Sequence, residues 1–411
     1  MEIRANLYAW TQLGPQGLFA RALTLDAACP SITIDGTPMQ MVRRHGTKPP
    51  GFEEIEVCDM PIPDGTESVM LDGVPLPLAP AQPTRIAILG DTGCRISEYQ
   101  AQDCNRDAPG GWRFPTLARS IAATEPDLII HLGDYHYREA ACPDATPGCA
   151  LSPYGPNWES WKADFFAPAH DLLPKAPWIF LRGNHEDCNR GWRGWFFALA
   201  PGPLPQNPWN PDNCQTHTSW YPVALGDWSA ALLDSATAPH AFTPPADPLT
   251  VAAYAAQLEE IADAAGAASD TWLMTHRPFW AAAAFEVSGN PQLAGGDITL
   301  QASLAATDRE AFPPGISALF AGHIHTFERI LFPDGRPPQF VIGNSGTSSD
   351  PPITPELIAA YPEVFAELGT SPQNLMTRNS VAFALLEPSS GGWTLSLRDV
   401  EGAEIDTVAV P

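Results

Sequence analysis

The chain has 411 residues, and its 22 Lys and Arg against 47 Asp and Glu give a formal net charge of −25 at pH 7. This charge disfavours a nucleic-acid scaffold and an anionic membrane surface as partners, because both bind basic proteins. No apolar run approaches the ~20 residues of a membrane span. The length suggests two or three domains, and the oligomeric state stays open.

The first 80 residues predict a small all-β, sandwich-like domain. Short apolar segments alternate with turn residues, and Asp35-Gly36 and Asp72-Gly73 are typical of two-residue hairpins. The Pro-rich stretch 76–83 predicts a linker. We therefore divide the chain into residues 1–80 and 81–411. The expected strands are 3–10, 22–27, 31–34, 39–42, 53–57 and 68–71.

From Arg85 the pattern changes to α/β. A strand at 85–89, a helix near 115–124 and a strand at 128–132 form a βαβ unit. Asp247-Pro248 predicts the start of a second helix, which runs to about Ala265. The segments 339–342, 380–386, 393–398 and 404–410 predict a second sheet that closes the domain. In the long excursion 140–177, Trp158 and Trp161 are expected to pack rather than to line a pocket, and the same holds for Trp192 and Trp195.

Five apolar runs of this region end in turns that carry polar side chains. Carboxyl ends of strands are where sites gather in α/β sheets. Oxygen and nitrogen donors of this kind suit hard or borderline metal ions. The turns hold Asp91, Asp134 with Tyr137, Asn184 with His185, His276, and His323 with His325. The remaining histidines His131, His170, His217 and His240 are expected to be structural, and His131 lies within a strand.

The eight cysteines fall into four close sequential pairs: Cys29/Cys58, Cys94/Cys104, Cys142/Cys149 and Cys188/Cys214. Four local disulfides would require an oxidising compartment. We therefore expect a periplasmic or secreted protein whose signal peptide is absent from this sequence. Other connectivities are open, and so is the alternative of eight buried or zinc-binding thiols in a cytosolic protein. The absence of a CxxC pair weakens the zinc version.

Taken in order, the turns read GDTG, GDYHY, GNHE, THRP and GHIH over residues 85 to 345. This order resembles the calcineurin-like metallophosphoesterases, and within them the purple acid phosphatases. Tyr137, three residues after Asp134, matches the GDxxY of that branch, and 322–329 is similar to GHxHxYER of its plant-type members. The resemblance implies the α/β (α+β) class: a four-layer metallophosphoesterase sandwich of two mixed β-sheets flanked by helices, preceded by the small all-β domain.

The resemblance also implies two metal ions, Fe(III) together with Fe(II), Zn or Mn. The first would be held by Asp91, Asp134, Tyr137 and His325, and the second by Asp134, Asn184, His276 and His323. Asp134 would bridge the two ions. The implied reaction is hydrolysis of a phosphate monoester, by attack of a metal-activated hydroxide on phosphorus in a small phosphorylated substrate.

One departure from the family concerns proton donation to the leaving group. Plant-type members carry further histidines after the THxP-type motif, whereas residues 279–286 contain none. Proton donation would then rest on His185, which would face the phosphate, or on His136, which could equally be a solvent-facing loop residue. A phosphodiesterase or nucleotide-cleaving enzyme on the same metals is an alternative. A non-catalytic scaffold is a second one, although no ligand position is lost.

Overall fold

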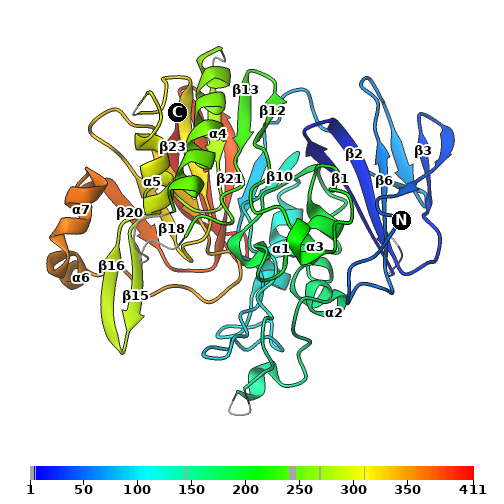
Figure 1. The fold of residues 1–411 in the computed structure, drawn as a ribbon, viewed down its shortest axis with the longest axis horizontal. Coiled ribbons are helices and arrows are strands. Elements are labelled where there is room, and N and C mark those ends of the chain that lie inside the picture. The colour runs from blue at the N-terminus through cyan, green and yellow to red at the C-terminus, as the bar shows by residue number, and fades with distance from the viewer. Residues whose placement is uncertain (1–3, 5, 144–145, 240–246, 268–269, 310) are drawn as a thin grey trace.

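The computed structural model describes residues 4, 6–143, 146–239, 247–267, 270–309 and 311–411. Two large mixed sheets pack face to face (Figure 1). The first has ten strands, in the order β23 (Glu404–Val410), β22 (Gly392–Asp399), β21 (Ala382–Ser389), β9 (Ile86–Leu89), β10 (Leu128–His131), β11 (Trp178–Phe180), β1 (Leu7–Gly14), β2 (Gly17–Thr24), β6 (Glu56–Pro61) and β5 (Val42–Arg43). The second has seven, in the order β12 (Tyr221–Leu225), β13 (Trp228–Leu232), β14 (Thr271–Met274), β17 (Ile316–Ala321), β19 (Gln339–Ile342), β18 (Phe327–Ile330) and β20 (Leu375–Arg378).

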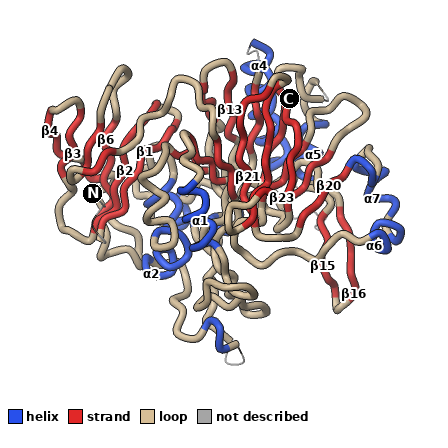
Figure 2. The backbone as a smooth tube through the Cα atoms, turned by 180° about the vertical axis from the view of Figure 1, so that it is seen from behind, coloured by secondary structure: helices blue, strands red, loops and turns tan. Residues whose placement is uncertain are grey.

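Helices cover the outer face of each sheet. Figure 1 shows α4 (Pro248–Ala267) and α5 (Ile298–Ala305) on the near side, beside the second sheet. Figure 2, from behind, shows α1 (Phe114–Ala123) on the opposite side. The shorter helices are α2 (Trp158–Trp161), α3 (Trp192–Gly194), α6 (Pro355–Ala360) and α7 (Pro362–Leu368). The layers are thus helix, sheet, sheet and helix, and the predicted fold class is confirmed.

Residues alternate along each central strand between two cores, because successive side chains point to opposite faces of a sheet. In β10, Ile130 lies in the core between the sheets, whereas Ile129 packs with α1. The predicted helix start at Asp247 is also confirmed, since its Oδ2 accepts the Thr250 N–H at 3.1 Å. Trp158, Trp161, Trp192 and Trp195 are all buried in the outer core of the first sheet, as predicted.

Residues 1–80 form the expected β region, and both predicted hairpin turns are present. Asp35 and Asp72 have φ of 47° and 51°, which the following glycines complete. A four-stranded sheet, β4 (Thr37–Gln40), β3 (Ser31–Ile34), β7 (Val69–Leu71) and β8 (Val74–Pro75), packs on β1, β2 and β6. However, β1 also lies parallel to β11, so this region extends the first large sheet. The domain boundary at residue 80 stays a prediction.

The prediction for the C-terminal strands was wrong in part. Residues 339–342 do belong to the second sheet, as β19, but 380–386, 393–398 and 404–410 do not. They form β21, β22 and β23, and β21 pairs antiparallel with β9 of the first sheet. The apolar alternation of these strands shows that they are half-buried, but it does not show which strand edge they pair with.

Candidate metal centre

The strands that carry the polar turns lie side by side. β9, β10 and β11 are parallel neighbours in the first sheet, and β14 and β17 are parallel neighbours in the second. Asp91 and Asp134 follow β9 and β10 with φ of 58° and 62°, in the left-handed region that sharp turns use. Position 133 must be glycine because the turn after β10 lies close against the turn after β11. A Cβ on Gly133 would lie 2.8 Å from Gly183 N. The turns therefore stack and direct their side chains to one point.

A first cluster of side chains surrounds the Tyr137 hydroxyl. This oxygen lies 2.9 Å from Asp91 Oδ1, 2.8 Å from Asp134 Oδ2 and 3.1 Å from His325 Nε2. His325 Nε2 is itself 3.5 Å from Asp91 Oδ1. Four residues from three separate loops thus present oxygen and nitrogen atoms to a common centre.

A second cluster shares Asp134 with the first. His276 Nε2 lies 3.0 Å from Asn184 Oδ1 and 3.3 Å from Asp134 Oδ2. Asp134, His276 and His323 each offer a ligand atom, and these atoms all lie within 4.8 Å of one another. All of the side chains singled out as possible ligands in the sequence are therefore brought together, in two groups with one shared carboxylate.

Neighbouring groups orient the three imidazoles, and Nε2 of His276 and of His325 faces the clusters. His276 Nδ1–H donates to the Leu132 carbonyl at 2.8 Å, and His325 Nδ1 lies 3.3 Å from Asp350 Oδ1. Arg277 Nη1 donates to His323 Nε2 at 3.0 Å, so this nitrogen carries a lone pair. Fixing the outer Nδ1, as at His276 and His325, is typical of metal-binding histidines.

The pKa shifts reveal an excess of negative charge in the clusters. Burial lowers the pKa of His325, but Asp350 and Asp91 outweigh burial and raise the pKa to about 9. Burial likewise lowers the pKa of His276, and Asp134 outweighs it. Burial and the charges of Asp134 and Asp91 raise the pKa of Tyr137. The donor set of carboxylate, phenol, amide and imidazole fits metal ions, whose positive charge would balance this excess.

The two candidate proton donors occupy different positions. His185 lines a cleft of about 610 Å³ beside the clusters, and its backbone N–H donates to Asp134 Oδ1 at 2.8 Å. Its ring lies 3.9 Å from the Tyr137 ring, centroid to centroid. His136 is only 2% exposed, contacts the Gly155 carbonyl and is absent from the described cleft lining. The alternative that His136 faces solvent was therefore wrong.

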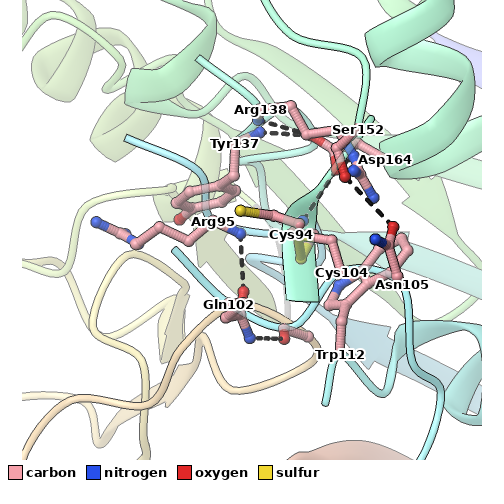
Figure 3. Close-up of a disulfide and its surroundings, with 12 residues drawn as sticks. Cys94, Arg95, Gln102, Cys104, Asn105, Trp112, Tyr137, Arg138, Ser152 and Asp164 are labelled. Atoms are coloured by element: carbon pink, nitrogen blue, oxygen red, sulfur yellow. Dashed lines mark hydrogen bonds and ion pairs between the residues drawn. A yellow bond between two sulfur atoms is a disulfide. The ribbon is translucent and has the colours of Figure 1, made fainter. Parts of the chain in front are cut away.

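Two buried carboxylates that the sequence analysis missed hold the loops in place. Glu186 accepts four backbone N–H bonds at 2.9–3.1 Å, from residues 134, 135, 136 and 183. Asp164 accepts the N–H groups of Cys94, Tyr137 and Arg138, together with Arg138 Nε at 2.7 Å (Figure 3). Glu186 could have been found from its place in GNHE, whereas Asp164 carries no local signal.

The eight cysteines form the four disulfides that the sequence pairing predicted. This content is typical of an oxidising, extracellular type of compartment. None of the helices in the described ranges combines the length and the apolar character needed to cross a bilayer.

Of the histidines expected to be structural, His131 is buried and bridges two loops. Its Nδ1 accepts the Gly133 N–H at 3.2 Å, and its Nε2 lies 3.0 Å from Thr92 Oγ1. His170 contacts Asp171, and His217 contacts Thr216. His240 lies outside the described residues.

Comparison with known proteins agrees with this geometry. Purple acid phosphatase 23 from Arabidopsis thaliana is 26% identical over 142 residues, which are 31% of this chain and 26% of that protein. The match thus spans about a quarter of that relative's length. The solved structure of purple acid phosphatase PPD1 from yellow lupin (Lupinus luteus) seeds has a TM-score of 0.58 at 13% identity, over 98% of this chain and 73% of that one. The structure of PhoD has a TM-score of 0.54 at 11% identity, over 98% of this chain and 88% of that one.

At these identities the two solved structures show a shared fold alone. The family described as calcineurin-like phosphoesterase matches residues 84–327, which contain the turns with Asp91, Asp134, Asn184, His276 and His323. This match covers more than half of the chain, and the chain therefore belongs to the calcineurin-like phosphoesterase family, a family of metallophosphoesterase hydrolases.

Proposed function

We propose that the protein is a dinuclear metal-dependent phosphatase that hydrolyses phosphate monoesters, similar to purple acid phosphatases. The observation that carries the proposal is the shared Asp134, which joins the two ligand clusters. Asp91, Asp134, Tyr137 and His325 would hold Fe(III), and Asp134, Asn184, His276 and His323 would hold Fe(II), Zn or Mn. When bound, the two ions supply an activated water and polarise phosphoryl oxygens.

In this proposal His185 protonates the leaving-group oxygen. Its Nδ1 lies 2.9 Å from Glu139 Oε1, and its Nε2 lies 3.9 Å from Asp134 Oδ2. Burial raises the pKa of Glu139, but His185 and Arg190 lower it below its ordinary value, so Glu139 is a carboxylate. This contact orients the His185 ring in the cleft, where a general acid would have to lie. The geometry offers His136 no comparable access to the cleft.

Two measurements test the proposal together: metal content, and rates on nitrophenyl phosphate and bis-(nitrophenyl) phosphate. We expect about two metals per chain and faster hydrolysis of the monoester. Asp134→Asn should lose metal and activity, whereas Asp171→Asn, at an 81% exposed side chain, should keep both. A faster diester rate would favour the phosphodiesterase alternative. If the metal-loaded protein hydrolyses neither ester, the proposed function is refuted and the alternative of a non-catalytic scaffold is supported.

We also propose that the protein acts in the periplasm or outside the cell. The four disulfides support this location, because thiols stay reduced in most cytosolic proteins. Fractionation of cells that express the full gene product, followed by immunoblotting, tests it. Recovery of the mature protein in the cytosol would refute the proposed location.

A further inference from the structure

Two arginines in the cleft lie directly against histidines of the metal clusters. Arg277 Nη1 is 3.0 Å from His323 Nε2, and Arg95 Nη2 is 3.5 Å from His325 Nε2. Both arginines line the cleft, and each has a buried Nε–H without a hydrogen-bond partner. Arg277 is only 4% exposed. Two guanidinium groups are thus held beside the clusters with donors to spare.

Each guanidinium is positioned by a rigid support. Arg95 lies over the Tyr137 ring, with its Cζ 4.8 Å from the ring centroid, and follows a cysteine of the Cys94–Cys104 disulfide (Figure 3). Its backbone N–H donates to Gln102 Oε1 at 2.7 Å. Arg277 is adjacent to His276 in the chain, and its Nη1 lies 3.9 Å from Asp297 Oδ2. Neither group needs a large movement to act in the cleft.

An imidazole nitrogen has one lone pair, so it cannot accept from an arginine and bind a metal at the same time. Metal binding at Nε2 of His325, the nitrogen that faces the first cluster, would therefore free the facing N–H of Arg95, and metal binding at Nε2 of His323 would free that of Arg277. Together with the two buried Nε–H groups, these donors then need acceptors. The phosphoryl oxygens of a substrate are anionic acceptors that match the planar fork of a guanidinium.

We propose that Arg95 and Arg277 form a phosphate clamp that becomes available when His323 and His325 bind metal through their Nε2 atoms. The clamp rests on the proposed function and adds substrate recognition to it. Two guanidiniums in addition to two metals favour a dianionic phosphoryl group over a monoanionic one. The clamp therefore favours monoesters as substrates. It also binds the product orthophosphate, which would act as an inhibitor. In a chain of charge −25, the clamp also supplies local positive charge to draw an anion in.

Orthophosphate binding, measured by titration calorimetry, tests the clamp without relying on turnover. Metal content of every sample is measured in parallel. We expect the metal-loaded wild type to bind phosphate, and Arg95→Met and Arg277→Met to bind it about tenfold or more weakly at unchanged metal content. Arg95→Lys and Arg277→Lys, which keep the charge and lose the fork, should also weaken binding. Arg106→Met, at a 56% exposed side chain, removes the same charge and should bind like the wild type.

Equal phosphate affinity in the wild type and in both methionine variants would overturn the clamp, even if the protein is a phosphatase. Wild-type protein that binds phosphate no more tightly with metals than without them would overturn it as well. If instead the clamp variants lose phosphate affinity but the loaded wild type hydrolyses no phosphate ester, the clamp stands and the proposed catalytic function fails. A rise in KM on the monoester, larger than on the diester, would further support the clamp.

Discussion

Asp164 is expected to be indispensable for the metal centre although it is not a ligand. Its side chain is fully buried and accepts from two loops at once, through Cys94 N–H at 3.0 Å and Tyr137 N–H at 2.8 Å. It also pairs with Arg138, whose side chain is only 4% exposed. Replacing Asp164 by Asn keeps the shape but removes the charge and turns one acceptor into a donor. That donor would then face two N–H donors.

The cost follows from these contacts. Removing one partner of a buried ion pair costs about 3–5 kcal/mol, because the other charge stays buried without compensation. Hydrogen bonds to a charged acceptor contribute ~1.5–3 kcal/mol each, and Asn can replace only part of them. These terms overlap, so we expect Asp164→Asn to lower the free energy of unfolding by about 3–5 kcal/mol in total. Tyr137 should then lose its fixed position, and metal content should fall.

Equilibrium urea unfolding followed by tryptophan fluorescence measures the stability loss, and elemental analysis measures the metal. The matched control is Asp171→Asn, in the same excursion, which should change stability by less than about 0.5 kcal/mol. If Asp164→Asn lowers the free energy of unfolding by less than about 1 kcal/mol and leaves the metal content unchanged, the reasoning is refuted. Removing one partner of a buried ion pair should cost at least ~3 kcal/mol.

Four further predictions concern separate parts of the molecule. Asp59 lies between Arg21 and Arg44, which outweigh burial and lower its pKa to about 2. Because the folded-state pKa lies below the unfolded value, Asp59 stabilises the fold above pH ~4 and this contribution is lost as pH falls toward 2. The free energy of unfolding in urea should therefore be about 2 kcal/mol higher for wild type than for Asp59→Asn at pH 7, and this difference should shrink below pH 4. A difference that stays constant with pH would contradict the prediction. Thiol titration of the denatured, unreduced protein should find none of the eight cysteines free, and most of them free would contradict the disulfides. Visible absorbance of the purified protein should disappear in Tyr137→Phe, whereas a colourless active wild type would argue against iron at the first site. His185→Ala should keep its metals and lose more activity on alkyl phosphates than on nitrophenyl phosphate, by about 10²-fold or more, and equal losses would remove its role as general acid.

The strand-end turns could be predicted from sequence because their signal is local. An apolar run, a sharp turn and a polar side chain stand together within about ten residues, as in 128–138. The structure brings Asp91, Asp134 and Tyr137 to within hydrogen-bond distance, as that order implies. Short sequential cysteine spacing was informative for the same reason.

The supporting residues could not be predicted because their partners are distant in the chain. Asp164 meets Cys94 across 70 positions, and Asp350 meets His325 across 25, with no periodicity to connect them. The placement of β21 beside β9 failed for a related reason. Alternation fixes which face of a strand is buried, whereas the choice of partner strand depends on the whole sheet.

The pairing of β1 with β11 has a consequence for how the chain folds. β1 precedes β11 in the chain and can pair with it only after β11 has formed, and the turns that carry Asp91 and Asp134 lie between the two strands. Until then the edge of β1 that will face β11 is unpaired, and an unpaired apolar edge of this kind promotes aggregation. Contacts between such distant segments also slow folding, since chain entropy is lost before the contacts form. Folding in the cell should therefore depend on early protection of the nascent chain, and on the N-terminal strands as the segment that finally covers β11.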